Sequence, residues 1–378
     1  MPDDRTAIID KVIEQFQNGL LTGERRVAAE MIRAYAGSWK AIRRNLDKLE
    51  KDIPRVKSGQ ISEQNWFYQN RRLLDLKPLI ENELKKFGDL AVDKISKQQL
   101  QAIEMSAEFA RDLVVLEMGG LHDIPDRLRI HNLNVKQIAA MIGINQPGSP
   151  LSTLFNSVMV GGGEAAFDIL SEAVTFGYNP RKVATMLKDS LGMTLTRSLT
   201  ISRTEMMRAA RIAAQETYKG SEVVNAWRWN ANPDGLTCPT CMIMHGTEHP
   251  IEERMNSHPR CRCVPVPITI SWEELGERFG LDLSSADKTS ADFEEVAKKY
   301  GLSPKQAKKF QFSQTKGTDY LSSLPVEKQI EILGVGRWQA WHDGNIKLED
   351  MIRETWSPVW GKGYAMKAVS SLPGGDHE

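Results

Sequence analysis

The chain has 378 residues, with 49 Lys or Arg and 49 Asp or Glu, so its formal net charge at neutral pH is zero. A balanced charge excludes a global basic field that would draw the protein to nucleic acid, although local basic patches remain open. No apolar stretch approaches the length needed to span a bilayer, and the opening residues MPDDR lack the apolar run of a secretory signal. We therefore expect a soluble protein of two or three domains with no membrane partner.

Apolar residues recur at helical spacing through the first 150 residues. They predict a helix over 6–21 and a longer one over 24–53, whose heptad-like apolar seam ends before a proline. Glycines and prolines then divide the pattern into shorter predicted helices over 62–74, 78–87, 96–118 and 134–142. We expect an elongated, all-helical N-terminal region over residues 1–150.

The second predicted helix carries a basic face. Arg43, Arg44, Lys48 and Lys51 lie away from its apolar seam, among acidic residues. Such a face is usually solvated, and contact with DNA phosphates is the sharper alternative.

Glycines also divide the next part of the chain. Gly161, Gly162 and Gly163 predict a hinge, because no Lys-Ser/Thr pair follows as a phosphate-binding loop requires. Helices are expected over 164–176, 180–192 and 195–218, each ending near a glycine. They lead directly into the segment that holds all four cysteines.

Residues 223–268, which we call the knuckle, read as two strands around a cysteine-containing loop. In the first strand Val223, Asn225, Trp227 and Trp229 share one face, and a turn is expected over 232–235. The return strand over 264–268 has proline at every second position, which predicts an edge strand. A unit this short needs a crosslink or a neighbour to be stable.

The cysteines and one histidine have the spacing of a closed metal site. Cys238 and Cys241 are separated by two residues, so one turn presents both sulfurs to one ion. The second half would be His258 with Cys261 or Cys263. An extended segment points Cys261 and Cys263 the same way but not His258 and Cys261, so the site closes only if the chain turns between them.

Structural zinc is the favoured crosslink for these residues. Reduced thiols, or disulfides formed outside the cell, are the alternatives. A closed site of Cys and His stabilises a fold and leaves no open position for catalysis. His245 and His249 are expected to be loop residues rather than ligands.

The last hundred residues read as a helical C-terminal region with a tryptophan-rich tail. Ser271 to Glu274 form a capping box, and helices are predicted over 292–300, 304–310 and 325–333. The tail's four tryptophans form either a small core or anchors for a partner protein, and we favour the partner. They are Trp338, Trp341, Trp356 and Trp360.

An ordered series of motifs over residues 150–270 resembles the phage Mu F-like family of minor head (head morphogenesis) proteins. It starts with Ser202-Arg-Thr-Glu205 on an alanine-rich helix and passes through Trp227, Asp234 and Thr237-Cys-Pro-Thr-Cys241. It closes with His258-Pro-Arg-Cys-Arg-Cys263 followed by prolines.

The resemblance implies a minor capsid protein, assembled in the host cytoplasm and found in the virion at the portal vertex. Its partners would be the portal protein, the major capsid or scaffolding protein, and packaged DNA. The residues that match polar positions of the family motif are Arg203, Glu205, Asp234, His258 and Arg262. Charged residues beside a knuckle usually form a paired structural network, which we expect for Arg203, Glu205, Asp234 and Arg262.

We therefore predict a mainly α protein with a small β-rich Cys/His knuckle, in regions 1–150, 151–270 and 271–378. We rank a non-enzymatic assembly protein first. An HNH-like metal-dependent nuclease is suggested by His245, Asn256 and His258, but the His or Asp pair expected before the knuckle is missing. A zinc-knuckle DNA-binding protein would need a basic loop, whereas Glu248, Glu252 and Glu253 lie there.

Overall fold

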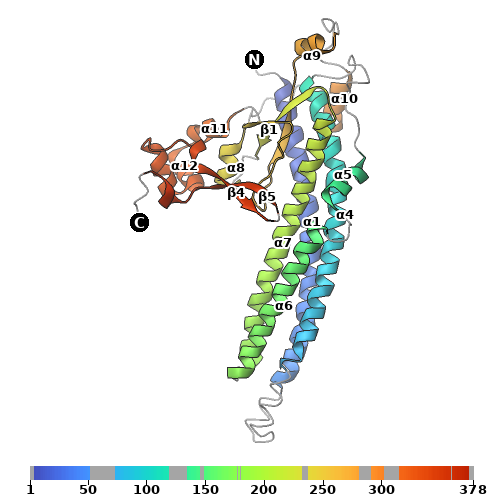
Figure 1. The fold of residues 1–378 in the computed structure, drawn as a ribbon, viewed down its shortest axis with the longest axis vertical. Coiled ribbons are helices and arrows are strands. Elements are labelled where there is room, and N and C mark those ends of the chain that lie inside the picture. Colours follow the sequence, from blue (N-terminus) through green and yellow to red (C-terminus); the bar gives the residue numbers. More distant parts are fainter. Residues whose placement is uncertain are drawn as a thin grey trace, which may run out of the picture. The chain divides into compact units, whose positions relative to one another are not determined.

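The computed structural model describes residues 4–51, 73–118, 134–144, 149–176, 178, 180–231, 237–280, 291–301, 315–358 and 360–373. These residues form a mainly helical protein with small antiparallel sheets, as predicted (Figure 1). Most of the helix predicted over 62–74, the helix over 304–310 and the turn over 232–235 lie outside the described residues. Within the described part of the chain, none of the helices is both long enough and apolar enough to cross a membrane.

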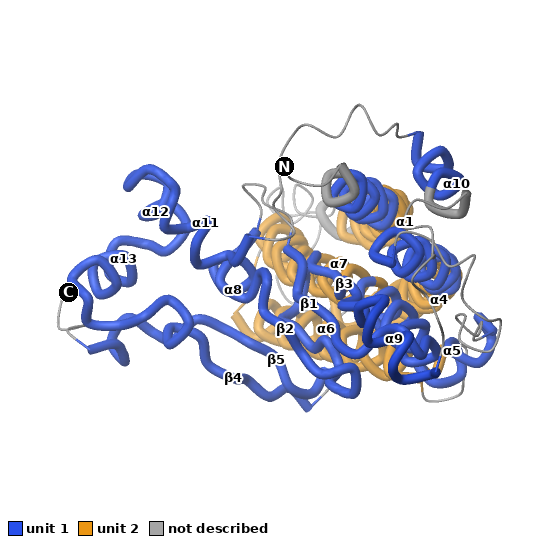
Figure 2. The backbone as a smooth tube through the Cα atoms, turned by 90° about the horizontal axis from the view of Figure 1, so that it is seen from above, with its two compact units in different colours: residues 1–21, 100–142, 207–378 blue, residues 22–99, 143–206 orange. Residues whose placement is uncertain are grey.

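The chain divides into two compact units, which Figure 2 colours separately. Three long helices contribute residues to both units: α1 (Asp4–Glu50), α4 (Leu76–Met118) and α7 (Pro180–Lys219). Unit 1 comprises residues 1–21, 100–142 and 207–378, and unit 2 comprises residues 22–99 and 143–206.

Unit 2 consists of helical segments from α1, α4 and α7 together with α6 (Pro150–Phe176). Its apolar side chains face inward at helical spacing, and the Tyr35 and Phe87 rings meet edge to face with centroids 4.8 Å apart. The Tyr35 hydroxyl donates a hydrogen bond to the Leu191 carbonyl. The buried hydroxyl of Tyr35 is thus satisfied within the bundle.

Several predicted helix breaks are wrong, because the helices run through their glycines. α1 continues past Gly23, α4 past Gly88, α6 past Gly161–Gly163, and α7 past Gly192. A Cβ at Gly88 would lie 2.9 Å from Met159 Cγ, so glycine lets α4 and α6 approach closely. A local cost of about 1 kcal/mol per helical glycine is offset by this packing.

Unit 1 packs the start of α1 and the ends of α4 and α7 around one apolar cluster. Phe16 and Phe109 stack in it with ring centroids 3.8 Å apart. Three shorter helices belong to the same unit: α5 (Val135–Ile142), α9 (Trp272–Phe279) and α10 (Ala291–Lys299). The predicted cap of α9 is confirmed, since Ser271 Oγ accepts a hydrogen bond from the Glu274 N–H.

The knuckle is a three-stranded antiparallel sheet in the order β2-β1-β3. Its strands are β1 (Val224–Asn230), β2 (Glu248–Pro250) and β3 (Val264–Thr269). β3 is an edge strand, which confirms the prediction made from its prolines. A bulge between Val224 and Ala226 leaves Asn225 exposed while Trp227 and Trp229 are buried, so the predicted shared face is wrong for Asn225.

The C-terminal tail contains the helices α11 (Gly317–Ser323), α12 (Val326–Leu333) and α13 (Val335–His342). The short turns η4 (Glu349–Met351) and η5 (Val369–Ser371) flank a hairpin of β4 (Ile352–Ser357) and β5 (Gly361–Met366). The tail predicted as helical thus contains three helices and, in addition, a hairpin that was not predicted. Thr, Trp and Tyr favour the pleated conformation there, and Gly361 has the positive φ of a turn residue.

Candidate metal centre

The short helix α8 (Pro239–Met244) brings the first two cysteines together. Cys238 is its N-cap and Pro239 takes the first helical position, where the missing N–H costs nothing. The Cys241 N–H donates to Cys238 Sγ over 3.4 Å, so both sulfurs face the same side of the first turn. The two-residue spacing thus has the local structure expected from the sequence.

A tight turn returns the chain to these sulfurs. The Cys261 N–H donates to the His258 carbonyl over 3.3 Å, and Pro259 occupies the second position of the turn. Arg260 occupies the third with φ of +67°, in the left-handed region that such a turn usually gives to glycine. The donor spacing in the sequence required the chain to turn between His258 and Cys261. The left-handed conformation of Arg260 provides this turn.

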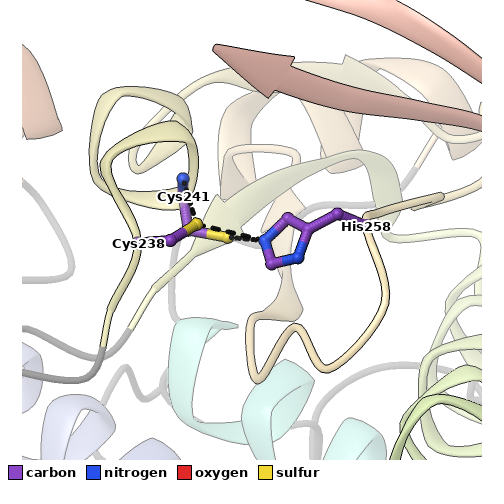
Figure 3. Close-up of side chains that lie close together, drawn as sticks. All are labelled: Cys238, Cys241 and His258. Atoms are coloured by element: carbon purple, nitrogen blue, oxygen red, sulfur yellow. Dashed lines mark hydrogen bonds between the residues drawn. The ribbon is translucent and has the colours of Figure 1, made fainter. Parts of the chain in front are cut away.

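His258 points its ring directly between the two sulfurs of α8 (Figure 3). Its Nε2 lies 3.1 Å from Cys238 Sγ and 3.1 Å from Cys241 Sγ. Its Nδ1–H donates to the Pro259 carbonyl over 2.8 Å, which leaves Nε2 as the ring nitrogen that faces the sulfurs. A histidine held in this way by its other ring nitrogen is the usual arrangement at metal sites.

The remaining two cysteines complete a group of five donors around Cys241. Cys261 Sγ lies 3.5 Å from Cys241 Sγ, and none of the four cysteines forms a disulfide. The donor atoms fall into two sets in which every pair lies within 4.8 Å, and Cys241 belongs to both. The sets are Cys238, Cys241, His258 and Cys241, Cys261, Cys263.

The metal-free cluster is strongly polarised. The hydrogen bond from Cys241 and the nearby His258 lower the pKa of Cys238 to about 5, against the opposing effect of burial. Burial lowers the pKa of His258, but the adjacent Cys238 and Cys261 sulfurs outweigh it and raise that pKa to about 10. At neutral pH the metal-free site therefore holds a thiolate–imidazolium pair.

Side chains on one face of helix α7 donate hydrogen bonds to backbone carbonyls of the knuckle. Arg211 donates from Nε to the Cys263 carbonyl and from Nη2 to the Cys261 carbonyl, both over 2.8 Å. Gln215 Nε2 donates to the Glu253 carbonyl, and the Tyr218 hydroxyl donates to the Pro265 carbonyl. This role was not predicted from the sequence. The spacing of Arg211, Gln215 and Tyr218, at positions i, i+4 and i+7 of an alanine-rich helix, places the three side chains on one face and could have indicated it.

The predicted polar network is distributed between the units. In unit 2, Arg203 Nη2 donates to both carboxylate oxygens of Glu24, at 3.0 Å from Oε1 and 2.8 Å from Oε2. The buried Glu205 accepts a hydrogen bond from Gln99 at its backbone carbonyl. In unit 1, Arg262 Nη2 donates to Thr237 Oγ1 over 3.4 Å. The fourth predicted member, Asp234, lies outside the described residues, and the network as a whole stays a prediction.

The other two histidines of the knuckle lie outside the donor sets. His245 caps the end of α8, is buried, and accepts a hydrogen bond at Nδ1 from the Ala231 N–H. His249 lies in strand β2, so its assignment to a loop is wrong, and its ring stacks on Trp227 with centroids 4.3 Å apart. Both rings have structural contacts in the sheet.

The four tail tryptophans have different environments. Trp338 and Trp341 pack against a buried cluster that includes Met242 and Ile243 of α8, and Trp338 Nε1 donates to Gln329. Trp356 is 78% exposed on β4. Trp360 is half-buried near the turn of the hairpin. Part of the set thus forms a small core, and binding of a partner stays a prediction.

These observations define a class of protein: a mainly helical chain that carries a small Cys/His knuckle. Residues 167–266 match the family described as Phage Mu protein F like protein. The match confirms the resemblance to the Mu F-like family that the motifs over residues 150–270 indicated. The matched residues include all five donors, together with Arg211 and Gln215. Comparison with curated proteins and with solved structures found no match.

Proposed function

We propose that this protein is a minor capsid protein of a tailed phage or prophage, acting in head assembly at the portal vertex of the virion. The observation that carries the proposal is the family match over residues 167–266, which contains the five donors of the knuckle and the helix α7 that holds it. The portal protein is its principal partner, with the major capsid or scaffolding protein as further partners.

The chemistry of the knuckle supports a structural role over a catalytic one. Cys241, Cys261 and Cys263 are only 2–3% exposed, and His258 points inward at two sulfurs. Four donors from Cys and His fill a tetrahedral ion and leave no position for water. An HNH-like nuclease needs such an open position beside its general-base histidine, so we place catalysis last.

Trp356 is our candidate anchor for the portal protein. Its indole is 78% exposed on the hairpin, and buried tryptophans are favoured at the centres of protein interfaces. The control is Met193, an apolar residue of α7 that is 70% exposed. Co-expression with the portal protein of the same phage, followed by affinity capture of the portal, should retain this chain. Trp356→Ala should weaken the retention and Met193→Ala should not.

Failure of the wild-type chain to co-purify with the portal protein would contradict portal association. Equal retention of wild type and Trp356→Ala would move the contact away from the hairpin. Incubation of the purified chain with plasmid and Mg²⁺ or Mn²⁺ tests the enzyme alternative. Cleavage that disappears in His258→Ala would replace the structural proposal by a nuclease.

Contact with packaged DNA is an accessory part of the proposal. Arg44 and Lys48 are exposed on α1 and Lys51 is exposed directly after its last residue, whereas Arg43 is paired with Asp47 over 2.6 Å. Phosphate contacts by such a face would be independent of base sequence and weaken steeply with salt. Replacement of the three exposed residues by Gln should remove salt-sensitive binding to double-stranded DNA. Unchanged binding would exclude this face.

A further inference from the structure

We propose that Cys238, Cys241, His258 and Cys261 bind one zinc ion in a tetrahedral structural site, and that Cys263 remains a free thiol. The inference is independent of the proposed role in head assembly. It rests on the positions of the five donors and on the groups that hold them.

Three of the separations between the proposed ligand atoms are close to those of a tetrahedral ion. With Zn–S of about 2.3 Å and Zn–N of about 2.0–2.1 Å, the ligand atoms of such a site lie about 3.5–3.8 Å apart. The Cys241–Cys261 sulfur separation is 3.5 Å, and His258 Nε2 lies 3.1 Å from both sulfurs of α8. Cys261 lies outside the set of Cys238, Cys241 and His258, in which every pair of donor atoms lies within 4.8 Å, so its side chain moves toward that set when the ion binds.

The surroundings orient each donor in the way that metal sites require. The His258 Nδ1–H is used by the Pro259 carbonyl, so Nε2 faces the sulfurs. Backbone N–H groups point at two sulfurs, from Cys241 to Cys238 Sγ and from Cys263 to Cys261 Sγ, each over 3.4 Å. Hydrogen bonds of this kind stabilise thiolates, which are the form that binds zinc.

The choice between Cys261 and Cys263 follows from their contacts. Cys261 interacts with both Cys241 and His258, so it lies against members of both halves of the site. Cys263 contacts Cys241 and Cys261, and its backbone N–H supports the Cys261 sulfur instead. Since a structural zinc ion takes four ligands, Cys263 is the fifth and remains outside.

The donor types select the metal. Three thiolates and one imidazole in tetrahedral arrangement are typical of zinc, and soft sulfur ligands disfavour magnesium, calcium and manganese. A disulfide between Cys241 and Cys261 is the competing crosslink, but it would require the sulfurs to close from 3.5 Å to about 2.05 Å.

The first test uses the unmodified chain, purified under reducing conditions without added metal. We expect one zinc ion per chain by elemental analysis. Exchange with Co²⁺ should give the visible absorption of a tetrahedral ion, with the sulfur-to-cobalt intensity of three thiolates. Absence of bound zinc together with failure to take up Co²⁺ would overturn the proposal. So would a mass two hydrogens lower that reports a disulfide.

The second test assigns the ligands with matched variants. Cys261→Ser should lower zinc affinity by at least about 100-fold, whereas Cys263→Ser should keep one zinc ion per chain. His258→Cys supplies a replacement donor, so it should retain the ion and raise the sulfur-to-cobalt intensity, while His258→Ala should lower the affinity. Zinc retained in Cys261→Ser and lost in Cys263→Ser would overturn the assignment. If Cys261→Ser does not fold, the Co²⁺ spectra of wild type and Cys263→Ser decide, because equal intensities are expected only if Cys263 is not a ligand.

Discussion

Arg211 of α7 donates a hydrogen bond from Nε to the backbone carbonyl of Cys263 over 2.8 Å. Arg211 as a whole is 5% exposed, so this bond and the second bond to the Cys261 carbonyl form away from water. A planar, permanently charged fork is suited to holding two carbonyls at once. A helix side chain thus fixes the backbone of the very segment that carries the second half of the donor group.

Replacement of Arg211 by Lys should destabilise the protein even though the charge is kept. The ammonium cannot reproduce the two directed bonds, and a carbonyl left without its buried partner costs about 1–3 kcal/mol. Urea unfolding should show this loss of free energy. The control is Arg197→Lys, since Arg197 is exposed on the same helix and its replacement should stay within about 0.5 kcal/mol of wild type. Equal effects of both variants would contradict the role of Arg211.

Arg260 has the left-handed backbone conformation, with φ of +67°, in the turn that brings His258 to the sulfurs. Glycine adopts this conformation without the penalty of about 1–2 kcal/mol that a side chain brings. We expect Arg260→Gly to keep or raise the melting temperature and Arg260→Val to lower it. The zinc affinity, measured by competition with a chelator, should also be higher in the glycine variant than in the valine variant. A lower zinc affinity in the glycine variant than in the valine variant would show that the turn geometry does not control the site.

Neighbouring glycines of α6 should respond in opposite ways to alanine. A Cβ at the exposed Gly161 meets nothing within 4 Å, so Gly161→Ala should stabilise the helix by about 0.5–1 kcal/mol. At the buried Gly162 a Cβ would lie 2.8 Å from Thr194 Oγ1. Overpacking of this kind costs about 1–3 kcal/mol. Thermal unfolding of the two variants measures the difference, and equal stabilisation would contradict the close packing of α6 and α7 in unit 2.

The metal-free protein should show an unusually acidic thiol at Cys238. The Cys241 hydrogen bond and the His258 ring place its pKa near 5, so the thiolate predominates at pH 7. Because the folded pKa lies below the unfolded value, this group's contribution to stability is complete above its unfolded pKa and is lost as pH falls through about 5. Mass-mapped alkylation should have a midpoint near pH 5 at Cys238. In His258→Ala the midpoint should rise, and a midpoint near 8.5 in wild type would contradict the polarised pair.

The tail should detach if Gly317 gains a side chain. The Gly317 N–H donates to the His245 carbonyl over 2.8 Å, and a Cβ there would lie 1.6 Å from the Met242 carbonyl oxygen. The backbone of α8 cannot yield without losing its own hydrogen bonds. Gly317→Ala should therefore expose residues 315–373 to limited proteolysis. Thr318→Ala, at the next position, should leave the cleavage rate unchanged.

Removal of zinc should loosen the same tail. Cys238 and Cys241 lie at the start of α8, and the next two residues, Met242 and Ile243, belong to the apolar cluster of the tail. Loss of the ion frees the start of this helix, and a six-residue helix is not stable by its own propensity. Hydrogen exchange in α11 and α12 should therefore rise after chelation. An increase in hydrogen exchange that is confined to residues 238–263 would show that the tail is held independently of the metal site.

Local patterns were enough to predict many of the elements. The cap at Ser271, the prolines of β3 and the helical spacing of the buried residues depend on the chemistry of near neighbours in sequence, and each was confirmed. Glycine was the misleading signal. Gly88 and Gly162 break helices by propensity, but they are retained inside helices because side chains from other helices take up the space.

The sequence by itself determined the donor types, their two-residue spacing and the need for a turn after His258, because these are properties of adjacent residues. Only the tertiary structure decided that Arg211, 50 residues before Cys261, holds the backbone of that turn. It also separated the tryptophans into a buried part and the exposed Trp356. Long-range contacts select one of many pairings that the same local patterns allow, and their energy comes from burial that no short stretch displays.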